Sequence, residues 1–116
     1  MVDSYANFAA LSAHESEGVD YRIVVSGREG SYAVMAPHGG GIEAGTSQIA
    51  TAIAGHDVPL YLFEGMKPEG NGVLHVTSGN FDEPRALGLA AQVDRIVAVH
   101  GRKDLQGGQT DGATVW

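Results

Sequence analysis

The hydrophobic residues of this chain fall into short runs separated by polar and glycine-rich stretches. Apolar positions at helical spacing predict helices over residues 5–14 and 46–54, and a polar start followed by proline predicts a third over 82–92. Short β-branched and aromatic runs predict strands over residues 21–25, 32–36, 58–63, 73–77 and 96–99. Residues 113–116 resemble the beginning of a further strand, which ends the sequence at Trp116. Short strands that alternate with helices predict a layered α/β fold.

Local features refine these elements. The strands at 21–25 and 32–36 are separated by a short glycine-bounded stretch, which favours a hairpin or two neighbouring strands. Thr46 or Ser47 is expected to cap the second helix and Gly55 to end it, and Asp82 is expected to cap the third. Strands that are apolar throughout are expected to be buried on both faces.

Composition places the chain among ordinary globular proteins. Its 116 residues suit a single domain, with 43% hydrophobic and 18% charged residues. The chain contains no cysteine. Disulfides, thiolate metal sites and cysteine nucleophiles are therefore excluded, and the composition suits a reducing compartment.

The charge pattern excludes several partners. The net charge is −7, and the seven basic residues form no cluster, so we expect no nucleic-acid partner. No apolar run approaches the roughly 20 residues needed to span a bilayer, so no membrane partner is expected. The first residues lack the basic and apolar regions of a secretory signal, which predicts a cytoplasmic protein.

Two of the five histidines share an unusual context. His38 follows the apolar run 32–36 and precedes three glycines, whereas His100 follows the apolar run 96–99 and precedes Gly101. Each is therefore expected at the carboxyl end of a buried strand, where open α/β sheets place their ligands. Neighbouring glycines let the backbone and a ligand approach closely. The two imidazoles are expected to converge at one edge of the sheet.

Glu43 adds a carboxylate to this pair. It follows His38 by five residues, beyond the glycine loop and just before the second predicted helix. Two imidazoles and one carboxylate, with water in the fourth position, form the ligand set of catalytic zinc in carboxypeptidase-type enzymes. The alternative is that His38 and His100 are hydrogen-bonded loop histidines without a metal. Spacing alone leaves both interpretations open.

Other candidate residues have simpler explanations. His75 is predicted inside the strand 73–77, as a buried, hydrogen-bonded histidine or a partner that orients a ligand. Asp82 and Glu83 suit the start of a helix. The glycines at 39–41 lack the motif of a phosphate-binding loop, and Ser47 lacks the context of a hydrolase nucleophile.

Five ordered motifs resemble the poly-γ-glutamate hydrolase family, phage and bacterial zinc enzymes often described as phage-related replication proteins. The longest is residues 36–47, APHGGGIEAGTS, in which Ala44 replaces a proline usual in the family. The others are LYLFEG at 60–65, LHVTS at 74–78, FDEP at 81–84 and VHG at 99–101. Together they extend the resemblance over nearly all of residues 21–116.

The resemblance implies a three-layer, carboxypeptidase-like α/β fold with a mixed, mainly parallel sheet in a single domain over residues 1–116. It implies one Zn²⁺ bound by His38, Glu43 and His100, and hydrolysis of γ-glutamyl bonds in a polymer or peptide substrate. His75 and Arg85 are the candidates for substrate binding. A phage protein of this kind would be released from the cytoplasm by lysis. The alternative function is a non-catalytic, zinc-binding, phage-associated accessory protein.

The resemblance also concerns the catalytic base. Family members continue to a later Gly-Val-Gln-Leu-Glu motif whose glutamate acts as general base on the zinc-bound water. The sequence contains no such motif before it ends at Trp116. We therefore expect the general-base glutamate to lie beyond Trp116, and the chain to lack the family's C-terminal segment.

Overall fold

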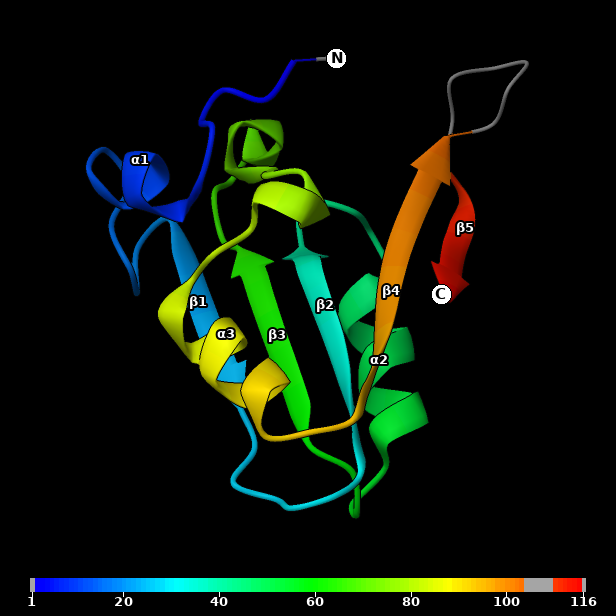
Figure 1. The fold of residues 1–116 in the computed structure, drawn as a ribbon. Coiled ribbons are helices and arrows are strands. Elements are labelled where there is room, and N and C mark those ends of the chain that lie inside the picture. Colours follow the sequence, from blue (N-terminus) through cyan, green and yellow to red (C-terminus); the bar gives the residue numbers. More distant parts are fainter. Residues whose placement is uncertain (1, 104–109, 116) are drawn as a thin grey trace.

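The computed structural model describes residues 2–103 and 110–115, which form a sheet between helices (Figure 1). Within these described residues, three helices and two short 3₁₀ helices accompany five strands. In chain order they are α1 (Phe8–Ser12), β1 (Tyr21–Val25), β2 (Tyr32–Gly40), α2 (Thr46–Ala54), β3 (Leu60–Gly65), η1 (Asn71–Leu74), η2 (Ser78–Asn80), α3 (Pro84–Ala91), β4 (Arg95–Lys103) and β5 (Thr110–Val115).

The sheet has the strand order β1-β3-β2-β4-β5. The three central strands β3, β2 and β4 run parallel, whereas β1 and β5 pair antiparallel at the two sides. The predicted mixed sheet is confirmed. The expectation that β1 and β2 form a hairpin or lie side by side is wrong, because β3 inserts between them and pairs with both.

The strand expected at the end of the sequence is present, with an earlier start. The pattern predicts its beginning at residue 113, whereas β5 begins at Thr110 and extends to Val115. Its pairing with β4 joins Val99 to Val115 and His100 to Thr114. Trp116 was expected to continue this strand, and it lies outside the described residues.

Both faces of β2 and β3 are buried, as their apolar runs predict. The expectation is wrong for β4, which is only partly buried, because Ile96 is 42% exposed. Along β3, Tyr61 and Phe63 join a core cluster with residues of α1, η1 and α3, whereas Leu60 and Leu62 join a second cluster with α2. This alternation follows from the two-residue period of a strand. Figure 1 shows α3 in front of the sheet and α2 behind it. The result is the expected three-layer arrangement.

Two predicted strands differ from the structure in ways that affect the site. The strand at 32–36 continues to Gly40, so that His38 lies inside the last part of β2. The strand predicted over 73–77 is wrong, because η1 ends at Leu74 and residues 75–77 have no regular structure. Val76 is nevertheless fully buried in the core cluster that includes Phe63. Burial explains why this segment has the hydrophobicity of a strand.

The helix starts also differ from expectation. Gly45 precedes α2 without a side-chain cap, and the hydroxyls of Thr46 and Ser47 instead bind the loop before the helix. Glu83 caps α3 by accepting from the amide of Arg85, whereas Asp82 accepts from the amide of Phe8. The predicted stop of α2 at Gly55 is confirmed, with a positive φ of 59°.

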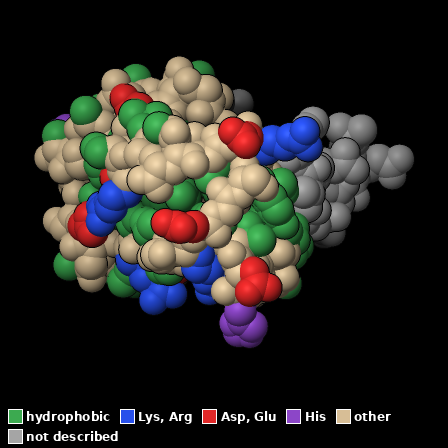
Figure 2. Space-filling view, turned by 60° about the horizontal axis from the view of Figure 1, so that its bottom comes forward, with side chains coloured by type: hydrophobic (Ala, Val, Ile, Leu, Met, Phe, Trp, Pro, Cys, Tyr) green, Lys and Arg blue, Asp and Glu red, His purple; other side chains and the backbone are tan. Residues whose placement is uncertain are grey.

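The surface at the amino ends of the parallel strands carries both charges. Figure 2 shows that acidic and basic side chains are interspersed over the described part of this face. Interspersed charges produce no extended field of one sign there. Among the described residues, no helix has both the length and the apolar character needed to cross a bilayer.

Candidate metal centre

His38 lies near the carboxyl end of β2 and is almost completely buried. The pairing between β2 and β3 shifts register between Ala36 and Gly39, an irregularity of the kind that redirects side chains near sites. Its Nε2 lies 2.6 Å from the carbonyl oxygen of Val76, and its Nδ1 lies 3.1 Å from Glu43 Oε1. Because a carbonyl only accepts, Nε2 must carry a proton. Nδ1 is therefore the atom that can bind a metal when the ring is neutral.

Glu43 lies in the loop between β2 and α2, which several hydrogen bonds fix. Its amide donates to the carbonyl of His38, and the Thr46 hydroxyl contacts the carbonyl oxygens of both residues. The amide of Gly101 donates to Glu43 Oε1 at 3.0 Å. A Cβ atom at position 101 would lie 3.1 Å from Glu43 Cβ, so this approach favours glycine. The glycine after His100 therefore has a definite steric role.

The hydrogen bonds to Glu43 favour its charged form. Partial burial opposes the charge and is the largest influence on the pKa of Glu43. The neighbouring His38, the Gly101 amide and His75 favour the charged form and together outweigh burial, so that the pKa lies below its ordinary value. Glu43 is therefore a carboxylate at neutral pH, the form in which it can bind a cation.

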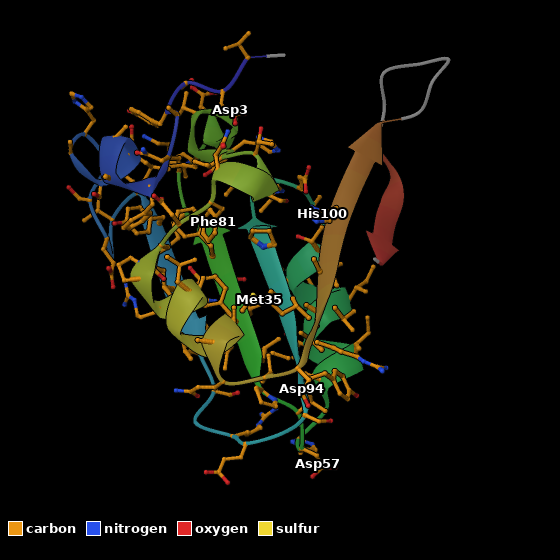
Figure 3. The ribbon with its side chains drawn as sticks, viewed as in Figure 1. Asp3, Met35, Asp57, Phe81, Asp94 and His100 are labelled. Carbon is orange, nitrogen blue, oxygen red and sulfur yellow. The ribbon has the colours of Figure 1, made fainter. Side chains whose placement is uncertain are left out.

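His100 lies on β4, the parallel neighbour of β2, and is labelled in Figure 3. Its ring centroid is 5.4 Å from that of His38, and the two planes are inclined by 51°. Its Nε2 lies 3.5 Å from Ser78 Oγ. Burial lowers the pKa of His100, and the neighbouring His38 acts in the same direction. The neutral imidazole that a metal requires is therefore favoured.

His75 also reaches this cluster, although it lies outside any strand. Its ring stacks on that of His38 with centroids 4.0 Å apart and planes inclined by 23°. His75 Nε2 lies 3.9 Å from Glu43 Oε2, and His75 Nδ1 lies 2.8 Å from Asp3 Oδ1. One potential ligand atom from each of His38, Glu43 and His75 lies within 4.8 Å of the others. Sequence reasoning missed Asp3, which carries no motif.

The donor set fits a cation. Since His38 Nε2 donates to Val76, a neutral His38 points the lone pair of Nδ1 at a carboxylate oxygen of Glu43, and two acceptors face each other. Either a proton on Nδ1 or a bound cation relieves this repulsion. Imidazole nitrogen and carboxylate oxygen are the ligands that zinc takes in catalytic sites. The cluster is therefore chemically suited to zinc.

Arg85 lies at the start of α3, where its guanidinium forms ion pairs with Glu17 and Glu83. Glu83 is itself buried and accepts from the Tyr61 hydroxyl. The structure thus joins these residues to one another, and Arg85 enters no contact with the histidine cluster among the described residues.

The general base expected from the resemblance is a separate matter from the ligands. The resemblance predicts a glutamate beyond Trp116, and Trp116 itself lies outside the described residues. Its position therefore stays a prediction. Among the described residues, Glu43 and Glu83 both have other partners, because Glu43 faces His38 and Glu83 accepts from Tyr61 and Arg85.

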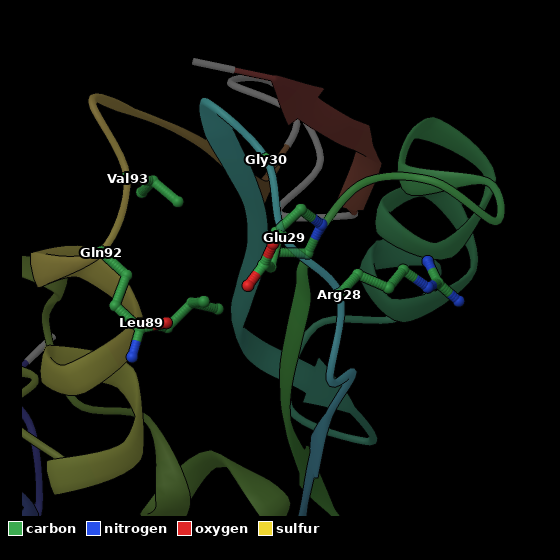
Figure 4. Close-up of a pocket in the computed structure, with 7 residues that line it drawn as sticks. Arg28, Glu29, Gly30, Leu89, Gln92 and Val93 are labelled. Carbon is green, nitrogen blue, oxygen red and sulfur yellow. The ribbon is translucent and has the colours of Figure 1, made fainter.

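A separate pocket lies at the amino ends of β2 and β3 (Figure 4). It is lined by Arg28, Glu29, Gly30, Pro59, Leu89, Gln92 and Val93. Arg28 donates to the carbonyl oxygens of Gly55 and Val58, which satisfies one nitrogen of its guanidinium. The lining contains no histidine, so the histidine cluster at the other end of the sheet is the stronger candidate site.

The fold and the cluster define a class: a three-layer α/β protein whose potential metal ligands gather at the carboxyl ends of parallel strands. The chain belongs to the poly-gamma-glutamate hydrolase family, whose model matches residues 5–111. Two solved structures share its fold. One is a bacteriophage poly-gamma-glutamate hydrolase, with a TM-score of 0.86 and 40% identity over 91% of this chain and 52% of that one. The other is YndL in a zinc-free apo form, with a TM-score of 0.79 and 38% identity over 88% of this chain and 55% of that one.

Curated relatives come from Bacillus subtilis (strain 168). The UPF0714 protein YndL is 43% identical over 99 residues, and the SPbeta prophage-derived UPF0714 protein YoqZ is 42% identical over 99 residues. Each match covers 85% of this chain but only 38% and 35% of the respective relative. The chain thus spans less than two fifths of the length of these two proteins.

Proposed function

We propose that this chain forms the metal-binding part of a zinc-dependent hydrolase that cleaves γ-glutamyl amide bonds, with poly-γ-glutamate as the substrate. The proximity of Glu43 to His38, with the ring of His100 centred 5.4 Å from that of His38, carries this proposal. The family relationship and the chemistry of the donors both favour it. The similarity to a bacteriophage poly-gamma-glutamate hydrolase supports the substrate. The similarity to YndL, whose structure is of a zinc-free form, supports the metal.

Ring orientation supports His100 as the third ligand. The lone pair of an imidazole nitrogen lies in the plane of its ring, so a metal bound by two rings must lie near both planes. The rings of His38 and His75 are nearly parallel and stacked at 4.0 Å, and their planes meet only far outside the cluster. The rings of His38 and His100 are inclined by 51° with centroids 5.4 Å apart, so their planes converge more steeply than those of the stacked pair. His75 is closer to Glu43, but its orientation is less suitable than that of His100.

The residues around the ligands prepare the site. Val76 holds the proton of His38 on Nε2, and Gly101 holds Glu43 in its anionic form. Zinc bound here would polarise the scissile carbonyl and lower the pKa of a coordinated water to about 7. His75, whose side chain is 32% exposed, is the better substrate-binding candidate, because the Arg85 guanidinium is already paired with two carboxylates.

Metal analysis of purified variants tests the ligand set. The wild-type chain should hold about one zinc per molecule, and His100→Ala should lose the metal more completely than His75→Ala. His56→Ala, at an exposed position after α2, is the matched control and should retain zinc like the wild type. Chelation should lower the melting temperature of the wild type, because a ligand that binds only the folded state stabilises it. Equal zinc retention by the His75 and His100 variants would refute His100 as the third ligand.

Cleavage of glutamate polymers tests the activity. The comparison is between γ-linked and α-linked polyglutamate, using this chain alone and this chain fused after Trp116 to the remaining part of YndL. We expect the fusion to release glutamate from the γ-linked polymer only, and the short chain to be much slower. A positioned acid–base group contributes about 10²–10⁴-fold, and the resemblance places that group beyond Trp116. Stoichiometric zinc without cleavage by the fusion would favour the non-catalytic alternative. Efficient cleavage of the α-linked polymer would contradict the substrate assignment.

A further inference from the structure

Residues 75–77, which we call the linker segment, contact His38 in two independent ways. The ring of His75 stacks on the ring of His38, and the carbonyl of Val76 accepts from His38 Nε2. The segment joins η1 to η2 without regular structure, so no strand pairing holds its backbone in place. The orientation of His38 therefore depends on whatever fixes the linker segment.

Asp3, near the N-terminus, forms hydrogen bonds that hold this segment in place. Its Oδ1 lies 2.8 Å from His75 Nδ1, and its Oδ2 accepts from the amide of Thr77 at 2.7 Å and from the Thr77 hydroxyl at 2.8 Å. Both carboxylate oxygens are thus used, and the side chain is only 15% exposed. Hydrogen bonds to a charged acceptor are roughly twice as strong as those between neutral groups.

We propose that Asp3 is a positioning residue of the metal centre, acting through the linker segment on His38 and His75. A neutral His75 that bonds to this carboxylate must carry its proton on Nδ1, which leaves the lone pair of Nε2 on the side of Glu43. In metalloproteins the group that accepts the second N–H of a ligating histidine fixes the orientation of its ring. This is the role of the Val76 carbonyl toward His38, and Asp3 acts one step further out by holding the segment that carries Val76. The inference rests on the proposed zinc centre for its effect on metal affinity, although the hydrogen bonds themselves do not.

Zinc competition with a chromogenic chelator measures the effect on the metal. Asp3→Asn keeps the size of the side chain but removes the charge and one acceptor. It should weaken zinc binding severalfold, less than the about 10–100-fold loss typical when a direct hydrogen-bond partner of a ligand is removed. Asp57→Asn is the matched control, because Asp57 is exposed and lies at the opposite end of the molecule from Asp3 (Figure 3). The control should match the wild type within about twofold, as expected for a surface change away from such contacts.

A spectroscopic measurement separates positioning from a general loss of stability. Long-range ¹⁵N correlations of the metal-free protein report which ring nitrogen of His75 carries the proton. The wild type should show the proton on Nδ1, and Asp3→Asn should show a mixture. Thr77→Val removes one hydroxyl donor from Asp3 and should weaken zinc binding less, which provides a second variant if Asp3→Asn does not fold.

The outcomes distinguish the two proposals. If the wild type binds no zinc, the proposed function fails, and the tautomer of His75 in the metal-free protein still decides the role of Asp3. If Asp3→Asn keeps the wild-type tautomer and the folded Asp3 and Thr77 variants bind zinc as tightly as the wild type, Asp3 is not a positioning residue. A lower melting temperature with unchanged tautomer and zinc affinity would likewise overturn the proposal.

Discussion

A buried hydrogen bond between β3 and the start of α3 permits a quantitative prediction for Tyr61→Phe. Tyr61 is fully buried, and its hydroxyl donates to Glu83 Oε1 at 2.8 Å. Glu83 is 1% exposed, and its other oxygen accepts from the amide and Nε of Arg85. This bond ties the sheet to the segment that leads from η2 into α3, where Ser78 lies beside His100.

The magnitude follows from the group left behind. Phenylalanine keeps the ring but leaves Glu83 Oε1 without its donor in a position that water does not reach. Loss of a hydrogen bond to a charged group costs about 1.5–3 kcal/mol. A domain of 116 residues has an unfolding entropy of about 0.24 kcal/mol/K, so the melting temperature should fall by about 6–12 °C.

The same pair predicts a dependence on alkaline pH. Burial, and then the hydrogen bond to Glu83, raises the pKa of Tyr61 far above its ordinary value. Above about pH 10 the unfolded chain loses this phenolic proton while the folded chain keeps it, so the free energy of unfolding should fall as the pH rises. The decline should be shallower in Tyr61→Phe than in the wild type. Urea titrations at several pH values between about 8 and 11 measure both effects.

The control is Tyr32→Phe, because Tyr32 begins β2 and is 36% exposed. Its stability should remain within about 0.5 kcal/mol of the wild type. If Tyr61→Phe is as stable as this control, the hydroxyl makes no net contribution and the reasoning is refuted. An equally steep alkaline decline in wild type and variant would refute the pKa argument separately.

Two further predictions concern the backbone near the site and the response to acid. Gly40 has a φ of 60°, and a Cβ there would lie 2.6 Å from the carbonyl oxygen of Gly65. Gly40→Ala should therefore lower the free energy of unfolding, measured by denaturant titration, by about 2 kcal/mol or more. Gly72→Ala, where a Cβ would meet open space, should lower it far less. Lys67 lies 2.7 Å from a carboxylate oxygen of Glu15, and its hydrogen bond is the largest cause that lowers the pKa of Glu15. The resulting stability is present above the unfolded pKa of about 4.5 and is lost as the pH falls through the folded value. The free energy of unfolding of Lys67→Gln should therefore fall less steeply with acid below about pH 5 than that of the wild type. An unchanged pH dependence would contradict this.

The fold class could be predicted from the order of residues along the chain. So could the part of the site formed by residues that are close together in sequence. Hydrophobic runs of strand length located all three central strands, and in β2 and β3 these runs reflect burial on both faces. His38 and Glu43 are joined by a short glycine loop, so their proximity is a local property that spacing can predict. The positions of His38 and His100 at the carboxyl ends of strands follow from the general rule for such sheets. That their strands are parallel neighbours, with the two rings 5.4 Å apart, comes from the folded structure.

The remaining features depend on packing between distant segments. The hydrophobicity of residues 73–77 reflects burial of Val76 in the core, and hydrophobicity alone does not distinguish a buried irregular segment from a strand. The contact of His75 with the histidine cluster therefore depends on packing that the sequence pattern does not predict. The contact of Asp3 with the linker segment joins residues more than 70 positions apart, and a single aspartate carries no pattern that specifies such a partner. Long-range pairings of this kind arise when packed layers bring distant segments together, and so they become visible only in the folded chain.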